Sequence, residues 1–235
     1  KKTVNHHYRD VQFIAQGEPK GSADAIKKTK SLWNKKYVLI LKGDMPLLTT
    51  KLLTDLYNQH IETNADISFV WSHNGDPTGY AYNRVVEKNE QPFIIPVNTL
   101  SHTELQNHCC ITTGIYLVNQ QLLKNFIDEV PEYHGEYSLS HLINIANESH
   151  KKITKVACPF DQVRSVKNYQ ELWAAEQIKR SELIKYWMER GVRFSAPQTV
   201  HIDLNVEIGS DTYIGCSVHL QNGTRIGQDC TIEHF

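Results

Sequence analysis

Three short segments of the 235-residue sequence combine residue types that could bind a nucleotide or a phosphate. The first runs from Gln16 to Ala25 (QGEPKGSADA) and is a glycine-containing loop that opens an expected helix. The backbone amides near Gly21 and Ser22 would have no helical partner, and they suit a carbonyl or phosphate oxygen. Gln16 can donate and accept hydrogen bonds together, which fits the N–H/C=O edge of uracil. The alternative is a simple turn in which Ser22 caps its own helix.

The second segment is Lys42-Gly-Asp44-Met-Pro46, which follows the apolar run Tyr37–Leu41 (YVLIL). Ligands in open α/β sheets bind beyond the carboxyl ends of strands. A carboxylate there could hold Mg²⁺ on substrate phosphates, since this ion prefers one or two carboxylates together with phosphate oxygens. Asp44 could equally stabilise a Gly-Asp-x-Pro turn. The third segment, Asp76-Pro-Thr-Gly79-Tyr80, is by its own composition only a turn.

Alternating helices and strands must position these segments. Apolar runs bounded by turn residues predict buried strands, and amphipathic stretches between them predict helices. A stretch from Gly75 to Leu100, rich in Pro, Gly and Asn, predicts loops and short strands over the sheet edge. The alternation predicts an α/β fold with a parallel, doubly wound sheet. The expected helices are Ala23–Trp33, Thr50–Ile61 and Leu139–Asn147, and the expected strands are Tyr37–Leu41, Ile67–Trp71, Ile115–Val118 and Ile153–Cys158.

A repeat with a period of six residues occupies the C-terminal part of the sequence. Large aliphatic residues recur without a gap, and small or β-branched residues such as Val206 and Thr212 follow four positions after the first five of them. This spacing suits neither an amphipathic helix nor a strand with one exposed face. It suits a triangular parallel β-coil in which each turn consists of three faces. The aliphatic positions are Ile202, Ile208, Ile214, Leu220, Ile226 and Ile232.

The sequence therefore predicts a nucleotide-binding domain over 1–167, a connecting helix over 168–192 and the start of a β-coil over 193–235. Asn168, followed three residues later by Glu171, predicts the N-terminus of a long helix that reaches about Met188. Gly191 lies where the C-cap of this helix should fall. The chain begins at Lys1 rather than at a methionine and stops inside a repeat, so we expect the native protein to be longer.

Composition narrows the classes of partner. The formal net charge is −1 and the lysines are scattered among acids, which leaves no basic surface of the kind that binds nucleic acid. No stretch approaches the roughly 20 apolar residues that a membrane span needs. Five cysteines without a framework spacing, and no signal peptide at the visible start, predict a cytoplasmic protein.

The order of these features resembles one family. The chain carries Gln-x4-Gly-Ser, a strand followed by Gly-Asp-x-Pro-Leu, Asp-Pro-Thr-Gly-Tyr, Thr-Thr-Gly-Ile-Tyr at 112–116, Gly-Glu-Tyr-Ser-Leu-Ser at 135–140, a long helix and then hexapeptides. Over essentially the whole chain, this series is similar to the bacterial bifunctional N-acetylglucosamine-1-phosphate uridylyltransferase/glucosamine-1-phosphate acetyltransferases. The resemblance implies a Rossmann-like nucleotidyltransferase domain, N-terminally incomplete in this chain, followed by the first coils of a left-handed hexapeptide-repeat β-helix.

The resemblance also implies an activity. A sugar-1-phosphate would attack the α-phosphorus of UTP, which releases pyrophosphate and forms UDP-N-acetylglucosamine, and such catalysis is chiefly positioning and charge neutralisation. By the resemblance, Gln16, Gly21 and Ser22 would contact the uridine. Asp44 would hold Mg²⁺ and act in catalysis, and Gly79 would lie against the sugar nucleotide. An acetyltransferase half and a homotrimer assembled through the β-helix are expected of the intact protein.

Four positions depart from the pattern of this family. Lys42 stands where a tyrosine is usual, and Pro96 stands where a sugar-binding glutamate is expected. Thr112, in the substrate-binding set, replaces an asparagine, and its hydroxyl provides only part of the hydrogen bonding of an amide. Lys167 aligns with a second Mg²⁺ ligand, and an ammonium group repels a cation; the adjacent Asn168 is either a displaced ligand or a helix cap. The alternatives to the enzyme are therefore a diverged non-catalytic sugar-nucleotide-binding or structural relative, or a nucleotidylyltransferase with another sugar or base preference.

Overall fold

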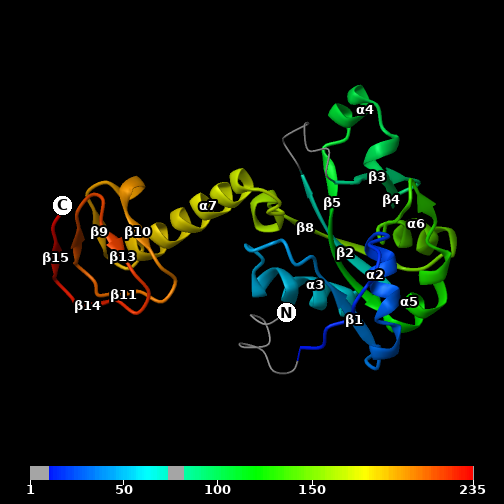
Figure 1. Ribbon diagram of the computed structural model, residues 1–235, viewed down its shortest axis with the longest axis horizontal. Helices are drawn as coiled ribbons and strands as arrows, with labels where there is room; N and C mark the ends of the chain where they lie inside the picture. Colours follow the sequence, from blue (N-terminus) through cyan, green and yellow to red (C-terminus); the bar gives the residue numbers. More distant parts are fainter. Residues whose placement is uncertain (1–10, 74–81, 235) are drawn as a thin grey trace. The chain divides into compact units, whose positions relative to one another are not determined.

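The computed structural model describes residues 11–73 and 82–234, which divide into two compact units (Figure 1). Within the described residues the first unit holds 11–43, 48–73 and 82–163, and the second holds 44–47 and 164–234. The short segment that carries Asp44 is therefore grouped with the C-terminal part of the chain, although the residues on either side of it belong to the first unit.

A mixed sheet of six strands forms the centre of the first unit. Its order is β4-β3-β5-β2-β8, and β1 also pairs with β5. Strand β5 is antiparallel to β1, β2 and β3, whereas β2 and β8 are parallel. A separate short hairpin joins β6 and β7. The strands are β1 (Tyr37–Ile40), β2 (Ile67–His73), β3 (Arg84–Lys88), β4 (Gln91–Ile95), β5 (Cys110–Asn119), β6 (Glu132–Tyr133), β7 (Glu136–Tyr137) and β8 (Ile153–Cys158).

The prediction of a parallel sheet is wrong at β5. A continuous apolar run indicates that a strand is buried on both faces, but it carries no information about strand direction. Strand β5 follows the β3–β4 hairpin and enters the middle of the sheet in the opposite direction to its neighbours. It also begins before the predicted Ile115–Val118, and this polar part is accommodated because the Thr113 hydroxyl donates a hydrogen bond to the Val70 carbonyl oxygen at 2.9 Å.

Helices pack against this sheet (Figure 1). The predicted helices over 50–61 and 139–147 are confirmed with small shifts at their ends. The sequence pattern did not predict α4 or α5, because helices of six or seven residues are too short to show a clear period. The helices described in the first unit are α2 (Ser22–Lys28), α3 (Thr50–Glu62), α4 (His102–Asn107), α5 (Gln120–Phe126) and α6 (His141–Glu148).

Side chains of β2 show which helices cover which face of the sheet. Ile67 and Phe69 belong to the core cluster that includes residues of α5 and α6. Ser68 lies between them in sequence and so points to the other face. There its hydroxyl contacts Nδ1 of His60 on α3 at 2.7 Å. Helix α3 therefore covers one face of the sheet, and α5 and α6 cover the other.

The predicted helix Ala23–Trp33 is interrupted at Thr29. The Thr29 hydroxyl donates to the Ile26 carbonyl oxygen at 2.7 Å and accepts from the Trp33 indole N–H at 2.9 Å. These bonds compete with the α-helical pattern, as threonine hydroxyls often do, so α2 ends and a short 3-10 turn follows. The 3-10 turns in the described residues are Lys30–Leu32, Val97–Thr99, Ile127–Glu129, Phe160–Val163 and Pro197–Thr199.

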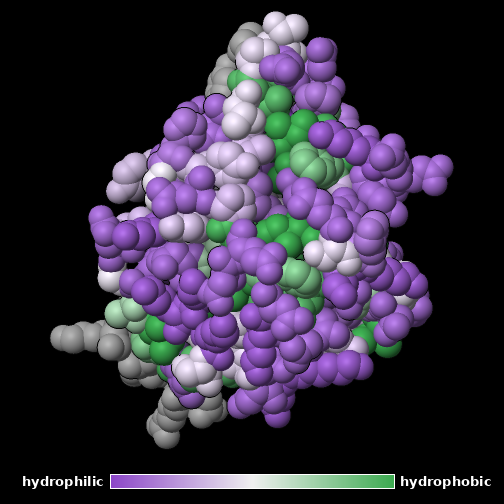
Figure 2. Space-filling model, turned by 90° about the vertical axis from the view of Figure 1, so that its right-hand side faces the viewer, coloured by the Kyte–Doolittle hydropathy of each residue, from purple (hydrophilic) through white to green (hydrophobic). Residues whose placement is uncertain are grey.

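The surface on the side that carries α5 and α6 is mainly hydrophilic (Figure 2). Hydrophobic residues show there in narrow areas between polar ones. Such a distribution is expected of helices that turn their apolar side to the sheet and their polar side outward. In the described part of the chain, no helix has the length and apolar character that crossing a membrane requires.

In the second unit, short parallel strand pairs follow the six-residue period. Strands β10, β11 and β12 pair with β13, β14 and β15, and each pairing joins residues 18 apart in sequence, which is three periods. Four of the six repeating aliphatic side chains are buried, and Ile226 and Ile232 pack against the same cluster, so their predicted inward placement is confirmed. The strands are β9 (Arg193–Phe194), β10 (His201–Ile202), β11 (Glu207–Ile208), β12 (Tyr213–Ile214), β13 (His219–Leu220), β14 (Arg225–Ile226) and β15 (Thr231–Ile232).

One long helix, α7 (Tyr169–Met188), precedes these strands, as predicted. Its N-cap is Asn168, whose side-chain oxygen accepts the Glu171 N–H at 2.9 Å. Towards its other end, Ile184 and Trp187 join the cluster of the repeating aliphatic residues. The helix and the short strands therefore share one hydrophobic core.

Candidate functional site

A cavity of about 540 Å³ lies in the first unit. The end of β1, the two residues before β3 and the N-terminal half of β5 form part of its wall, and α2 and the segment between β7 and α6 form another part. Groups that can hydrogen-bond stand among apolar ones in this wall, as in most small-molecule sites. The lining includes Ser22, Lys42, Asn83, Thr112, Ser138, Ser140 and His141.

The loop before α2 is tied to the segment after β7. Ser22 lines the cavity, and its hydroxyl accepts a hydrogen bond from the Leu139 N–H at 2.9 Å. Gly21 has a φ of 97°, and a Cβ atom on it would stand 2.6 Å from the Tyr137 carbonyl oxygen. Because Gly21 is the N-cap of α2 and provides no side-chain cap, the alternative interpretation of Ser22 as a helix cap is wrong. The tertiary structure thus joins two motifs that lie far apart in sequence.

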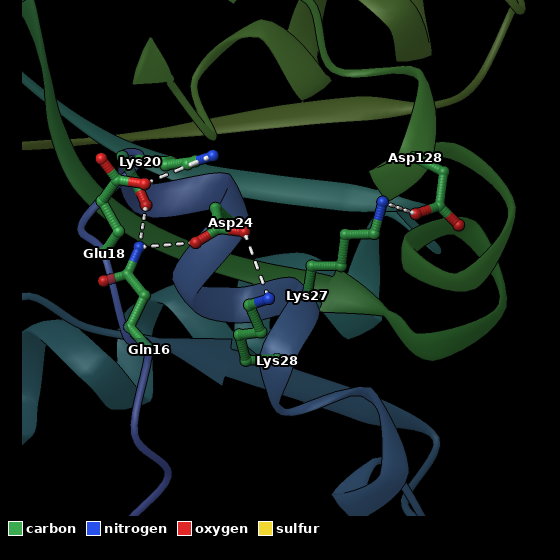
Figure 3. A network of polar contacts seen from close by, with 8 residues as sticks. Gln16, Glu18, Lys20, Asp24, Lys27, Lys28 and Asp128 are labelled. Carbon is green, nitrogen blue, oxygen red and sulfur yellow. Dashed lines mark hydrogen bonds and ion pairs between the residues drawn. The ribbon is translucent and has the colours of Figure 1, made fainter. Parts of the chain in front are cut away.

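Gln16 bonds to this loop but does not line the cavity (Figure 3). Its amide nitrogen donates to the Gly21 carbonyl oxygen at 3.0 Å and to Asp24 Oδ2 at 2.9 Å. Asp24 also pairs with Lys28 on the next turn of α2 at 4.0 Å. The amide hydrogens predicted to face uracil are therefore used within the protein, and only the carbonyl oxygen of Gln16 is left to accept a hydrogen bond from a base.

Lys42 follows β1 and crosses over β5 at the cavity wall. Gly114 on β5 has a φ of 89°, and a Cβ atom there would stand 2.6 Å from Cδ of Lys42, so the glycine leaves room for the lysine side chain. The Lys42 ammonium group lies 5.7 Å from the centre of the Tyr82 ring, within reach of a cation–π interaction. Among the described residues that line the cavity, Lys42 is the only one with a permanent positive charge.

Thr112 and Pro96 are two of the four positions that depart from the family pattern, and both line the cavity. The Thr112 N–H donates to the Asn83 carbonyl oxygen at 3.0 Å, and its hydroxyl lies 3.3 Å from the Tyr116 hydroxyl. Burial raises the pKa of Tyr116 to about 12, so this hydroxyl stays protonated beside Thr112. Pro96 begins the 3-10 turn Val97–Thr99, and its ring contributes no hydrogen-bonding group to the wall.

Asp44, the predicted metal ligand, is not among the residues that line the cavity. It belongs to the second unit, where its backbone oxygen accepts the Val166 N–H at 2.8 Å. Asn168 is used as the N-cap of α7, so its interpretation as a helix cap is confirmed. Within 11–73 and 82–234, no group of three or more His, Cys, Asp or Glu side chains is arranged to hold a metal ion. The predicted contact Gly79 lies outside the described residues.

Sequence reasoning missed two cavity residues, Asn83 and His141. The Asn83 amide nitrogen donates to Ser140 Oγ at 2.7 Å and to Ser138 Oγ at 3.3 Å, and its oxygen accepts the Val97 N–H at 3.1 Å. Asn83 thus connects three parts of the wall. The motif at 135–140 was a signal for the serines and for the adjacent His141, but it served only as a family marker. The sequence around Asn83 contains no comparable signal.

A family model described as nucleotidyl transferase matches residues 2–191, and the chain belongs to this family of enzymes. The first unit is accordingly an α/β nucleotidyltransferase domain of the Rossmann-like kind. Among curated proteins, the chain is similar to the bifunctional protein GlmU of Clostridium beijerinckii (31% identity over 229 residues, 95% of this chain and 50% of that protein) and to that of Thermoanaerobacter pseudethanolicus (30% over 236 residues, 99% and 50%). The chain spans about half the length of these curated relatives.

Solved structures support the same fold at low sequence identity. A protein of Entamoeba histolytica assigned as a UDP-N-acetylglucosamine pyrophosphorylase superposes with a TM-score of 0.62 at 13% identity, covering 92% of this chain and 65% of that one. A UDP-glucose phosphorylase of Trypanosoma brucei superposes with a TM-score of 0.53 at 14% identity, covering 92% and 64%. At these identities the similarity establishes the fold alone.

Proposed function

We propose that the intact protein is a sugar-1-phosphate uridylyltransferase of the cytoplasm, which forms UDP-N-acetylglucosamine and pyrophosphate from UTP and N-acetylglucosamine-1-phosphate. Membership of the nucleotidyl transferase family and similarity to proteins named GlmU support this proposal. The main observation in favour of the proposal is the cavity. Ser22, Lys42 and Thr112 come from three separate motifs and line one space of about 540 Å³.

In the proposed reaction, a phosphate oxygen of the sugar-1-phosphate attacks the α-phosphorus of UTP, and the bond to pyrophosphate breaks. The protein needs to align the two substrates and to offset their negative charge. Ser22 and Thr112 provide hydroxyl groups that can hold a substrate in place, and the Lys42 ammonium group offsets phosphate charge. Gly21 and Gln16 act in this proposal by shaping the loop that presents Ser22.

We further propose that Asp44 binds Mg²⁺ together with substrate phosphates. Mg²⁺ is commonly held by one or two protein carboxylates and completes its shell with phosphate and water oxygens. Asp44 provides one carboxylate, and the described residues provide no cluster of three ligands. A single protein carboxylate fits a Mg²⁺ ion that is held mainly by the phosphates of the bound substrate. When bound, Mg²⁺ would supply neutralisation of phosphate charge.

The six-residue repeats support a second part of the proposal. We infer that they are the first coils of a left-handed parallel β-helix, which in the intact protein continues into an acetyltransferase half and assembles a homotrimer. The strand pairs 18 residues apart favour three faces per turn. The relatives named bifunctional are about twice as long as this chain.

Release of pyrophosphate from UTP and N-acetylglucosamine-1-phosphate tests the proposed function, with Mg²⁺ present and the protein encoded by the whole gene. Turnover with this pair is expected. Turnover only with another nucleotide or another sugar-1-phosphate would support the alternative specificity. The departures from the family pattern at Pro96 and Thr112 are the reason to consider that alternative. Measurable binding of UDP-N-acetylglucosamine without any turnover would instead support a diverged binding protein, which the Lys167 replacement favours.

Lys42→Met is expected to weaken the binding of UDP-N-acetylglucosamine by about 10- to 100-fold, the range for a lost charge-assisted hydrogen bond. Methionine keeps the unbranched stem that lies over Gly114 but removes the charge. Titration calorimetry at low and high salt measures the effect, and the difference between wild type and variant should shrink at high salt because screening weakens the wild-type contact.

Lys36→Met is the matched control for this experiment. The Lys36 ammonium group also lies over a tyrosine ring, 4.9 Å from the centre of Tyr37, but Lys36 does not line the cavity. Its replacement should leave the affinity unchanged. Equal losses in both variants would contradict a specific role for Lys42 and indicate a general effect of net charge.

A further inference from the structure

His141 is buried in the cavity wall without hydrogen bonds for its ring. The residue opens α6 and is 4% exposed. Both ring nitrogens are buried, and neither has a hydrogen-bond partner in the described structure. Buried polar side chains are paired in the great majority of cases. A histidine that lines a cavity with two unmet nitrogens therefore indicates a ligand that would supply the partners.

The surroundings of His141 favour the neutral form of its ring. Burial lowers the pKa of His141, because charge is disfavoured away from water, and the Ser138 carbonyl acts more weakly in the opposite direction. A neutral imidazole has one N–H donor and one acceptor nitrogen. On one side the ring packs against Tyr133, with the ring centres 4.7 Å apart and a tilt of 40°. Tyr133 lines the same cavity.

The neighbouring polar groups differ from His141 because they already bond to one another. Ser138 and Ser140 hydroxyls lie 2.9 Å apart, and both accept from the Asn83 amide. This network fixes the segment that leads into α6 and so fixes the position of the His141 ring. The unmet hydrogen-bonding capacity of this part of the wall is therefore concentrated on His141.

We propose that His141 recognises the sugar of the substrate by donating one hydrogen bond and accepting one from adjacent sugar hydroxyl groups. This inference rests on the proposed function and names the group that selects the sugar. A pair of hydroxyls matches one donor and one acceptor, because each hydroxyl can do both. Tyr133, which lines the same cavity and is 41% exposed, provides an aromatic surface beside the His141 ring for the apolar side of a sugar. A phosphate would call for a cation instead, which Lys42 provides elsewhere in the wall.

His141→Phe removes both ring nitrogens and keeps an aromatic ring. The affinity of this variant for UDP-N-acetylglucosamine and for N-acetylglucosamine-1-phosphate is expected to fall by about 10- to 100-fold, as for two lost hydrogen bonds. Its affinity for UDP, which has no such sugar, should stay within about twofold of wild type. Because the nitrogens have no partners in the free protein, the melting temperature should stay equal or rise. His141→Gln, which keeps one donor and one acceptor, should retain most of the affinity.

His60→Phe is the matched control. His60 is equally buried at 1% exposed, but its Nδ1 is bonded to Ser68 and it does not line the cavity. This variant should melt at a lower temperature and bind all three ligands normally. Equal loss of UDP affinity in His141→Phe, or unchanged affinity for the sugar ligands, would overturn the assignment while leaving the proposed function intact. If the wild type binds no sugar nucleotide at all, the proposed function fails first and the inference fails with it.

Discussion

Asp44→Asn is expected to lower the rate of pyrophosphate release by about 10²- to 10³-fold, the loss typical of removing one group that stabilises charge in the transition state. The replacement keeps the shape of the side chain and removes the negative charge that a Mg²⁺ ion prefers. The backbone hydrogen bond between the Asp44 carbonyl and Val166 does not involve the side chain, so the variant can keep this bond. The Mg²⁺ concentration needed for half-maximal rate should rise, and this shift distinguishes a metal ligand from a residue that only shapes a turn.

Asp55→Asn provides the control for this experiment. Asp55 lies on the surface of α3 and pairs with Lys51 at 2.6 Å, away from the cavity lining. Its replacement should change neither the rate nor the Mg²⁺ dependence, since exposed ion pairs contribute little. Normal turnover by Asp44→Asn would show that the metal assignment is wrong. A lower rate with an unchanged Mg²⁺ dependence would favour the alternative role of Asp44 in the Gly-Asp-x-Pro turn.

Gly21→Ala is expected to destabilise the first unit by about 3 kcal/mol or more, since it combines a positive φ with a steric clash. A Cβ atom would stand 2.6 Å from the Tyr137 carbonyl oxygen and 2.7 Å from the Tyr137 nitrogen. The Tyr137 backbone cannot withdraw cheaply, because its N–H donates to the Lys20 carbonyl oxygen at 2.8 Å. The melting temperature should fall by about 6–12 °C. Binding of UDP-N-acetylglucosamine should weaken as well, because the clash would separate Ser22 from Leu139.

Gly17→Ala separates the two causes of this effect. Gly17 also has a positive φ, 80°, but a Cβ atom there would meet no other atom within 4 Å. Its replacement should cost only the strain of the left-handed conformation, about 1–2 kcal/mol. If the melting curves of the two variants superimpose, the close approach of Gly21 to Tyr137 is contradicted. Backbone strain would then be the reason for glycine at both positions.

The parts of the fold that could be predicted from the sequence are those with a long, regular pattern. The helix α7 and the inward side chains from Ile202 to Ile232 were predicted because each repeats one physical requirement many times. Strands β1 and β2 were predicted from their continuous apolar runs. The expected burial on both faces is confirmed for most of β2 but is wrong for β1, where Leu39 is 45% exposed because β1 pairs with β5 alone. The interruption at Thr29 was not predicted, since it depends on a single hydroxyl that donates to the Ile26 carbonyl oxygen and accepts from the Trp33 indole N–H.

The candidate site could be predicted only in part. Ser22 and Thr112 were chosen from motifs, and both line the cavity, as do the substituted positions Lys42 and Pro96. Gln16 was chosen for its hydrogen-bonding capacity, but the structure uses its amide nitrogen to hold Gly21. His141 follows directly after the motif at 135–140, but its residue type gives no further signal, because a histidine at the start of a helix is as common in a core as on a surface. Its importance appears only when both ring nitrogens are seen to be buried without partners.

The sequence by itself determined the class of fold, the repeat and the family, because composition, periodicity and the order of motifs are properties of the chain alone. The tertiary structure decided the direction of β5, the pairing of the Gly21 loop with Tyr137, and the set of side chains that share one cavity. These depend on contacts between residues far apart in sequence, and local propensities carry no information about which distant segment a loop will meet. The selection of the sugar, as we propose it for His141, belongs to this second group.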